Sequence, residues 1–230
     1  MTDARSQLVE NLAQIRAGID RACARADRDP ADVRLVAASK TVPIDPVRWA
    51  FEAGVSDFGE NYAKELVEKR PAVPGARWHF IGTLQSNTAP RVAELADIVE
   101  TLASERSTRR LARRAAERGR ELEALIEVDF TGERSGVTPR EVNAFADLVS
   151  DLEGIRLRGL MTLPPMPQAA QDSRPHFRRL RELLDDLRGD HPEALELSMG
   201  MSMDYEVAVE EGATMVRIGT ALFGERPPST

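Results

Sequence analysis

After Pro30 the sequence alternates short, continuous apolar runs with longer stretches that mix apolar and charged residues. Short apolar runs are typical of strands buried on both faces, and the stretches between them are long enough to form helices. Strands that alternate with helices build parallel β-α-β units. Eight strands are predicted, over residues 33–39, 56–59, 78–82, 98–101, 124–130, 156–162, 196–199 and 215–219.

Eight such units in succession predict the fold class, an α/β protein built as a single-domain (β/α)8 barrel of the TIM type. A doubly wound open sheet would give the same alternation and is the structural alternative. The length of 230 residues suits one barrel. Helices are predicted between the strands, over residues 45–53, 63–68, 104–118, 139–149, 173–187 and 205–211.

An extra helix is predicted before the first strand. Its apolar residues recur every three or four positions, which is the spacing of one face of an amphipathic helix; they are Leu8, Leu12, Ile15, Ile19 and Ala22. We therefore expect one domain with three parts: an N-terminal helical segment over residues 1–30, the barrel over residues 31–224, and a tail over residues 225–230.

The composition argues against several classes of function. A formal net charge of −7 gives no positive field to hold nucleic acid or an anionic membrane surface. The N-terminal segment is charged and has no continuous apolar run, so we expect no signal peptide and no membrane span, and a cytoplasmic location. Cys23 is the only cysteine and the three histidines lack the spacing of metal ligands, so neither a disulfide nor a metal site is expected.

Lys40 stands at the end of the first predicted strand, in the segment VRLVAASKTVP. The chain has 28 arginines but only three lysines, Lys40, Lys64 and Lys69, so each lysine is an exception. An arginine stays protonated, whereas a lysine in a dehydrated site can lose its proton and attack a carbonyl carbon to form a Schiff base. Functional groups of a barrel lie at the carboxyl ends of its strands. Lys40 is therefore a candidate Schiff-base residue; the alternative is a lysine whose amine simply reaches solvent.

Two glycine-containing segments follow the last two predicted strands. Residues 197–204 read LSMGMSMD and include Ser198, and residues 217–220 read RIGT and include Gly219 and Thr220. Loops after strands seven and eight of a barrel commonly hold a phosphate group. Together with Lys40 they predict a ligand with both an aldehyde and a phosphate. Pyridoxal 5′-phosphate (PLP) has both, and a phosphorylated sugar bound by a Schiff-base aldolase would meet the same two requirements.

Arg217 helps to choose between these ligands, because it ends the last predicted strand. It is the strongest candidate to face the pyridine nitrogen of PLP. A permanently cationic donor there would keep the ring nitrogen unprotonated and weaken the cofactor as an electron sink. A salt bridge at the end of the barrel is the alternative role for this arginine.

Five segments of the sequence resemble the pyridoxal phosphate homeostasis protein family, whose single domain is similar to the barrel domain of alanine racemase. They are LVAASKTVP, DFGENYAKE, WHFIGTLQSN, LRGLMTLPP and LSMGMSMDYEVAVEEGATMVRIGTALFGER, and they extend from residue 35 to residue 226. The resemblance covers nearly the whole chain, and its last segment is long and specific.

The resemblance implies a role for particular residues. Lys40 occupies the Schiff-base position of the family and Arg217 the position near the pyridine nitrogen, while the phosphate-binding positions are Ser198, Gly219 and Thr220. Asn61, in FGEN at the end of the second strand, is expected to border the cofactor. The sequence departs from the family pattern at Thr88, where a lysine is usual, and at Asp129, where asparagine is common in a loop that here is about two residues shorter.

These expectations favour a PLP-binding protein that carries or releases the cofactor in PLP homeostasis, without robust catalytic turnover. PLP-dependent apo-enzymes are candidate recipients. The alternative is a fold-type III amino-acid racemase, and a Schiff-base aldolase ranks below both. Alanine racemase has a second domain that completes its dimer and supplies a catalytic tyrosine, whereas this sequence ends soon after the eighth strand. We therefore expect a monomer, in which Tyr62 and Tyr205 are the only candidates for that second base.

Overall fold

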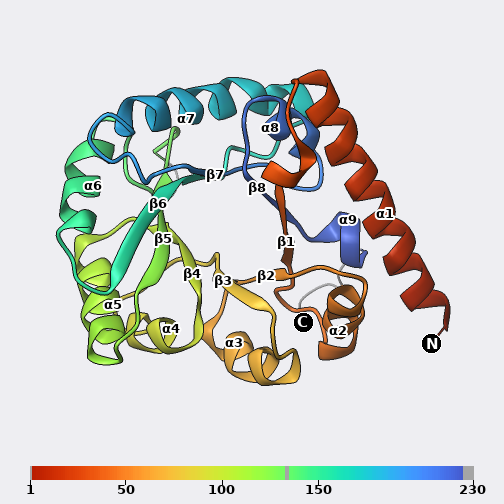
Figure 1. The fold of residues 1–230 in the computed structure, drawn as a ribbon, viewed down its shortest axis with the longest axis horizontal. Helices are drawn as coiled ribbons and strands as arrows, with labels where there is room; N and C mark the ends of the chain where they lie inside the picture. The colour runs from red at the N-terminus through yellow and green to blue at the C-terminus, as the bar shows by residue number, and fades with distance from the viewer. Residues whose placement is uncertain (1, 133–134, 225–230) are drawn as a thin grey trace.

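The structure of the protein is a computed structural model, which describes residues 2–132 and 135–224. The protein forms an eight-stranded parallel barrel. Each strand pairs with the next along the chain, and the last pairs with the first, so that the sheet closes (Figure 1). This confirms the predicted fold class and excludes the open sheet. The strands are β1 (Arg34–Ala38), β2 (Asp57–Glu60), β3 (Arg77–Phe80), β4 (Ile98–Leu102), β5 (Leu122–Val128), β6 (Ile155–Thr162), β7 (Glu196–Ser198) and β8 (Met215–Ile218).

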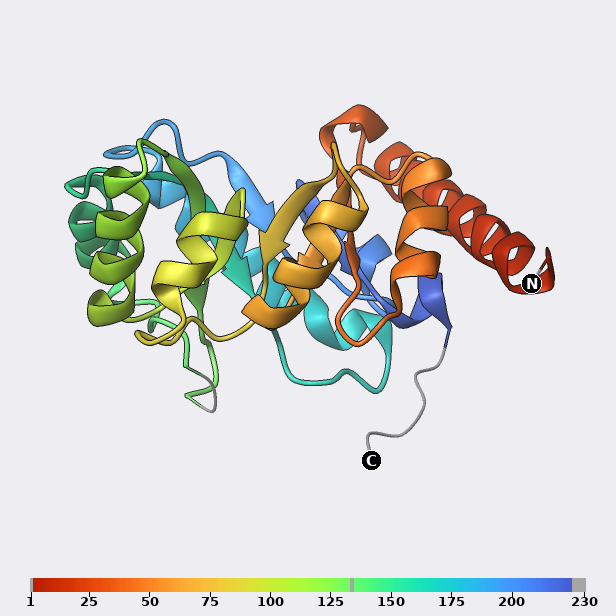
Figure 2. The same cartoon turned by 90° about the horizontal axis from the view of Figure 1, so that it is seen from below.

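Closure places the first and last strands of the chain side by side in the sheet. In the register between β1 and β8, Val36 pairs with Arg217 and Ala37 pairs with Ile218. Because all strands are parallel, their carboxyl ends open on the same side of the barrel. Figure 2 shows the long connections after β5 and β6 extending from one side of the barrel.

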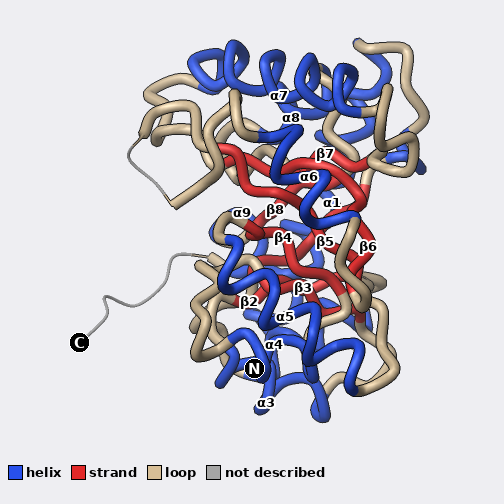
Figure 3. The backbone as a smooth tube through the Cα atoms, turned by 90° about the vertical axis from the view of Figure 1, so that its left-hand side faces the viewer, coloured by secondary structure: helices blue, strands red, loops and turns tan. Residues whose placement is uncertain are grey.

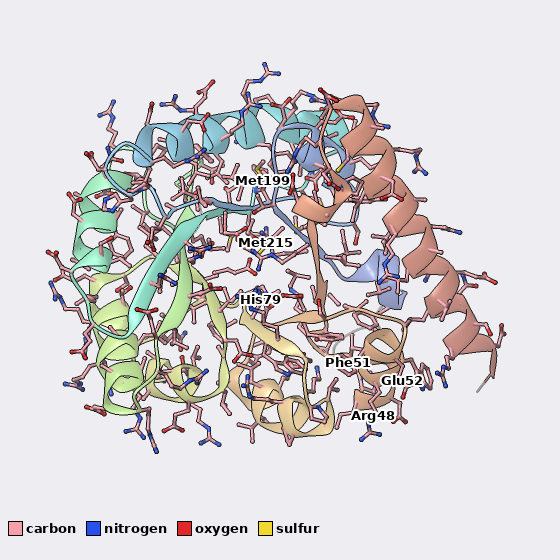
Figure 4. All side chains as sticks on the ribbon, viewed as in Figure 1. Arg48, Phe51, Glu52, His79, Met199 and Met215 are labelled. Atoms are coloured by element: carbon pink, nitrogen blue, oxygen red, sulfur yellow. The ribbon has the colours of Figure 1, made fainter. Side chains whose placement is uncertain are left out.

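The barrel interior holds both apolar and polar side chains. Val36, Leu125, Met161 and Met215 form a buried apolar cluster separate from the main core. His79 is fully buried, and Figure 4 shows it together with Met215 near the middle of the ring of strands. Side chains of a barrel strand alternate between the interior and the surrounding helices, so both faces of these strands are buried. This is why strands such as β1 read as apolar runs in the sequence, whereas Asp57 of β2 and His79 of β3 bring polar side chains into equally buried strands.

Helices surround the strands, as Figure 3 shows by colour. All six helices predicted between strands are confirmed, and the predicted N-terminal helix is confirmed as well. The helices are α1 (Thr2–Arg25), α2 (Ile44–Glu52), α3 (Ala63–Lys69), α4 (Ala89–Leu95), α5 (Glu105–Glu117), α6 (Val142–Ser150), α7 (Arg174–Leu187), α8 (Tyr205–Glu210) and α9 (Thr220–Phe223), with short 3-10 helices η1 (Pro30–Asp32), η2 (Arg70–Ala72) and η3 (Ala170–Ser173).

Two helices were not predicted, α4 and α9. The four residues of α9 make about one turn, which is too short to show a 3.6-residue period. The seven residues of α4 include a proline in the first turn, and a proline in a sequence is equally typical of a turn. The long α5 shows the opposite case, because Leu111, Ala112 and Ala115 form one buried face of a helix that is otherwise rich in arginine. Arg114 on that helix binds Glu94 of α4, so part of the basic run pairs with a neighbouring helix.

The predicted apolar face of α1 is buried against the barrel. Leu8, Leu12, Ile15, Ile19 and Ala22 are all buried, and the helix lies along one end of the molecule beside α2, α8 and α9 (Figures 1 and 2). The whole of α1 lies inside the predicted N-terminal segment of residues 1–30. The predicted tail, residues 225–230, lies outside the described residues.

Candidate functional site

A cavity of about 640 Å³ opens among the loops at the carboxyl ends of the strands. Five of the six predicted site residues line it: Lys40, Asn61, Arg217, Gly219 and Thr220. The structure therefore brings together residues that lie up to 180 positions apart, the difference between 40 and 220. Ser198, the sixth, is not among the lining residues.

Lys40 lies in a tight turn directly after β1. The N–H group of Val42 donates to the carbonyl oxygen of Ser39 at 2.9 Å, which closes a four-residue turn with Lys40 at its second position. Thr41, the third residue, has a φ of 61°, in the left-handed region that β-branched residues rarely adopt. The lysine at the cavity is thus presented by a strained turn rather than by the strand itself.

Asn61 follows β2 directly and lies against the end of β3. A methyl group placed on Gly82 would lie 2.0 Å from the carbonyl oxygen of Asn61, so only glycine fits at that position. The hydroxyl of Thr101, in β4, donates to the carbonyl oxygen of Gly82 at 2.6 Å. This contact fixes the Gly82 segment and, through it, the backbone that carries Asn61 to the cavity.

Arg217 lines the cavity from β8 and is almost fully buried. Its guanidinium donates to the hydroxyl of Ser198 at 2.5 Å and to the carbonyl oxygen of Thr162 at 2.8 Å. Glu100 lies 3.8 Å away. Burial lowers the pKa of Arg217 below its ordinary value, although nearby carboxylates act in the opposite direction. Because an arginine starts from so high a pKa, it stays a cation here.

Arg217 begins a chain of hydrogen bonds that crosses the barrel interior. The hydroxyl of Ser198 donates to Glu100 at 2.5 Å, and the other oxygen of Glu100 lies 2.6 Å from Nδ1 of His79. The Nε2 atom of His79 lies 3.0 Å from Asp57. Ser198 is therefore buried between Arg217 and Glu100, where it orients the arginine.

The charges of this chain stabilise one another. Burial alone would lower the pKa of His79, but its hydrogen bonds to Asp57 and Glu100 outweigh burial and raise the pKa above its ordinary value. Burial likewise opposes ionisation of the two carboxyl groups, but the contact with His79 holds the pKa of both Asp57 and Glu100 below the ordinary value. The interior thus favours a protonated histidine between two carboxylates.

The loops after β7 and β8 place hydroxyl groups at the cavity. Ser202 and Thr220 both line it, and the hydroxyl of Ser202 accepts a hydrogen bond of 3.1 Å from the N–H group of Ala221. Asp204 holds this region together, because it accepts from the N–H group of Met201 at 2.7 Å and from the hydroxyl of Ser173 at 2.6 Å.

Ser202 is a lining residue that was not predicted from the sequence. Both Ser198 and Ser202 belong to the segment LSMGMSMD, and either could be assigned to a phosphate from the sequence. The signal that distinguishes them is that Ser198 ends the strand, where a side chain can point into the barrel, whereas Ser202 lies in the loop beyond it.

Neither tyrosine lines the cavity. Tyr62 is largely exposed. The hydroxyl of Tyr205 would lie 2.1 Å from a methyl group placed on Gly18, so the ring packs against α1, and burial raises the pKa of Tyr205. Thr88 and Asp129, the two departures from the family pattern, are also absent from the lining. The loop after β5, which the sequence predicts to be about two residues shorter than in the family, includes residues 133 and 134, which lie outside the described residues.

Neither a membrane-spanning helix nor a metal-binding cluster occurs in residues 2–132 and 135–224. No helix there is both long enough and apolar enough to cross a membrane. Within the same ranges, no group of three or more histidine, cysteine, aspartate or glutamate residues is arranged to hold a metal ion.

The fold and the cavity together define a class: (β/α)8 barrel proteins with a ligand site that combines a strand-end lysine, a buried arginine and loop hydroxyl groups. The family model described as alanine racemase, N-terminal domain, matches residues 11–227. Pyridoxal phosphate homeostasis proteins of Aquifex aeolicus and Pseudomonas aeruginosa are 40% and 42% identical to the chain, over 94% and 96% of its length and 97% and 96% of theirs. The chain belongs to the pyridoxal phosphate homeostasis protein family, which confirms the resemblance noted in the sequence.

Solved structures agree with this assignment. The structure of PipY of Synechococcus elongatus with PLP bound has a TM-score of 0.84 and 34% identity, covering 94% of this chain and all of that one, 100%. An alanine racemase of Clostridium difficile has a TM-score of 0.75 at 16% identity, with 96% of this chain and 60% of that chain covered. The second likeness concerns the fold alone.

Proposed function

We propose that the chain binds PLP, holds it as a Schiff base on Lys40, and carries or releases it in PLP homeostasis. The observation that carries the proposal is the meeting of Lys40, Arg217 and the hydroxyl groups of Ser202 and Thr220 in one cavity. Its volume of about 640 Å³ lies in the usual range of small-molecule sites. The names of the relatives and the PLP bound to PipY support the same ligand.

The donor groups of the cavity suit the chemistry of PLP. Bound PLP would supply an aldehyde, a phosphate and an electron-withdrawing ring. The Lys40 amine would hold the aldehyde carbon through a bond that forms with loss of water and is reversed by addition of water. This reversible bond can hold a cofactor and later release it.

Each of the other residues would contact a different part of the ligand. Ser202, Gly219 and Thr220 stand on the last two loops, where barrels commonly bind phosphate, and Asn61 borders the same cavity from β2. Arg217 is the candidate partner of the ring nitrogen. Ser198 would act indirectly, because its hydroxyl contacts Arg217 rather than the cavity.

Two features favour a carrier over a racemase. A buried arginine would keep the ring nitrogen unprotonated, which weakens withdrawal of electrons from a bound amino acid. Among the described residues that line the cavity there is also no tyrosine to serve as a second base. Met166 and Met203 line the cavity and are largely exposed, which suits transfer to an apo-enzyme that docks at its mouth.

The racemase alternative makes a different prediction. A racemase would exchange the α-proton of a free amino acid with solvent deuterium in a sustained, Lys40-dependent reaction. A carrier would exchange it slowly or not at all.

The first test is covalent trapping of the ligand. The protein saturated with PLP is expected to absorb visible light, and borohydride should add a hydride to the carbon-nitrogen double bond and leave PLP fixed to Lys40. Peptide mass mapping would locate the adduct. Lys40→Ala should abolish both the visible absorbance and the adduct, because Lys40 is the only lysine among the described residues that line the cavity.

Lys64→Ala is the matched control, since Lys64 is an exposed lysine of the same chain. It should keep the absorbance and the adduct at Lys40. An adduct on Lys64 or Lys69 of the unchanged protein would refute the assignment. A sugar phosphate trapped on Lys40, with no binding of PLP, would instead favour the aldolase.

A further inference from the structure

Side chains of helix α3 form hydrogen bonds with the backbone on both sides of Lys40. Lys69 of that helix donates a hydrogen bond to the backbone of Ser39, the residue before Lys40, and Glu65 accepts one from the backbone of Thr41, the residue after it. The third lysine of the chain, Lys64, lies on the same helix but is exposed. Of the three lysines, one therefore lines the cavity, one contacts the turn that carries it, and one faces solvent.

Lys69 holds the residue before Lys40. Its side chain is only 4% exposed, and its ammonium donates to the carbonyl oxygen of Ser39 at 2.7 Å. The same group donates to Glu60 at 2.8 Å and to Glu65 at 3.3 Å. A buried cation is costly unless it is paired and hydrogen-bonded, and these three acceptors satisfy its three donors.

Glu65 holds the residue after Lys40. One of its carboxylate oxygens accepts a hydrogen bond of 2.5 Å from the N–H group of Thr41. Thr41 is the residue with a φ of 61°. A strained conformation of this kind costs on the order of 1–3 kcal/mol and persists only where the surrounding structure holds it. The contact with Glu65 is such a restraint.

Glu60 connects the same group of residues to β2. Its carboxyl accepts from the hydroxyl of Ser39 at 2.7 Å as well as from Lys69. Burial raises the pKa of Glu60 to about 7, against the effect of Lys69. The ammonium of Lys69 therefore lies between two carboxyl groups and a carbonyl oxygen, all of them next to the Lys40 turn.

We infer that Lys69 and Glu65 are positioning residues, which hold the turn from Ser39 to Val42 and so set the direction from which the Lys40 amine meets the carbonyl group of its ligand. The inference rests on the proposed Schiff base at Lys40. It adds a role for two residues that do not line the cavity and that act on the backbone on either side of the reacting lysine.

The test uses three variants of α3 and two measurements. Glu65→Ala removes the acceptor of the Thr41 N–H group, Glu65→Gln keeps an oxygen that can accept it, and Lys69→Met removes the ammonium. Amide hydrogen exchange of Thr41 and Val42 is measured in protein without PLP. The rate of PLP capture by Lys40 is then followed by absorbance, with the adduct located after borohydride reduction.

Glu65→Ala and Lys69→Met should both speed exchange of these amides and slow capture about tenfold, as expected when a reacting group loses its orientation. Glu65→Gln should recover most of the rate. Lys64→Met, the matched control on the exposed side of α3, should change neither measurement. If Lys69→Met fails to fold because Glu60 loses its partner, the pair of Glu65 variants still decides the question.

The outcomes separate this inference from the proposed function. Capture by Lys40 in the unchanged protein, with the same exchange and capture rates in Glu65→Ala, would overturn the positioning role and leave the proposed function intact. Absence of any PLP adduct on Lys40 in the unchanged protein would overturn both.

Discussion

At the scale of single residues, the two serines of LSMGMSMD have different surroundings although they are only four positions apart. Ser198 is buried at the end of β7 and links Arg217 to Glu100. Ser202 lies in the next loop and lines the cavity. A strand-end side chain can point into a barrel, and a loop side chain can reach the ligand, so position within the element decides which serine can contact a phosphate.

This difference predicts how the two serines affect binding. Ser202→Ala should weaken binding of PLP by about 10- to 100-fold, because a hydrogen bond to a charged group contributes about 1.5–3 kcal/mol. It should leave binding of pyridoxal, which lacks the phosphate, nearly unchanged. Dissociation constants of both ligands, measured by fluorescence titration, would check this.

Ser198→Ala provides the comparison. This substitution removes a hydrogen-bond partner of Arg217, so it should weaken the binding of PLP and of pyridoxal by similar factors. A loss confined to PLP in Ser198→Ala, with no loss in Ser202→Ala, would restore Ser198 to the phosphate position that the resemblance implied.

At the scale of elements, the contact between α1 and α8 depends on one glycine. Gly18 is the point where the Tyr205 side chain reaches α1, and a methyl group placed on Gly18 would lie 2.1 Å from the Tyr205 hydroxyl. Ion pairs from Arg21 and Arg25 of α1 to Glu206, and from Arg25 to Glu210, surround this point. These contacts join α1 to α8. Because α8 directly follows the loop of residues 201–204, which line the cavity, they also link α1 to one wall of the cavity.

Gly18→Ala should therefore destabilise the protein. In an exposed helix position this change stabilises by roughly 1 kcal/mol, but overpacking against Tyr205 costs about 1–3 kcal/mol. The loss should shrink in a Tyr205→Ala background, where the ring no longer meets the added methyl group and the carboxylate of Glu206, 3.0 Å from it, is the remaining neighbour. Chemical denaturation of the four proteins in this cycle gives the free energies of unfolding. Stabilisation by Gly18→Ala in the presence of Tyr205 would contradict the close contact.

Sequence patterns predicted elements better than they predicted contacts between elements. All eight strands were found because most strands buried on both faces are rich in apolar residues, while α9 is too short to show a helical period and α4 begins with a proline that is also typical of a turn. Lys40 was predicted at a strand end because its chemistry differs from that of arginine. The hydrogen bonds of Glu65 and Lys69 with the turn that carries Lys40 were not predicted, because a hydrogen bond between a helix side chain and a distant backbone group produces no periodic pattern in the sequence.

At the scale of the whole molecule, the charges inside the barrel make stability depend on pH. His79 has a pKa raised above its ordinary value of 6.5, so its contribution is fully present below that pH and is lost as pH rises through the folded-state pKa. Asp57 and Glu100 have a pKa lowered below 3.8 and 4.5 respectively. Their contributions are present above those values and are lost as pH falls through the folded-state pKa values.

His79→Gln should remove the decrease in folding stability that His79 causes as pH rises. At neutral pH the variant should be less stable by about 3–5 kcal/mol, because it removes the cation between Asp57 and Glu100 and leaves Glu100 with only the more distant Arg217. The difference in unfolding free energy between the unchanged protein and the variant should shrink as pH rises above 6.5, which urea unfolding at a series of pH values would measure. A difference that does not shrink at any pH above 6.5 would contradict a protonated His79.

The closed sheet has a consequence for how the site is assembled during folding. Lys40 follows the first strand and Arg217 belongs to the last, and these two strands meet at the seam that completes the ring. Lys40, which would meet the aldehyde, and Arg217, which would face the ring, are therefore neighbours only when β1 and β8 have paired. A ligand that contacts both residues would stabilise the pairing of β1 with β8, and the paired strands would in turn favour binding of the ligand.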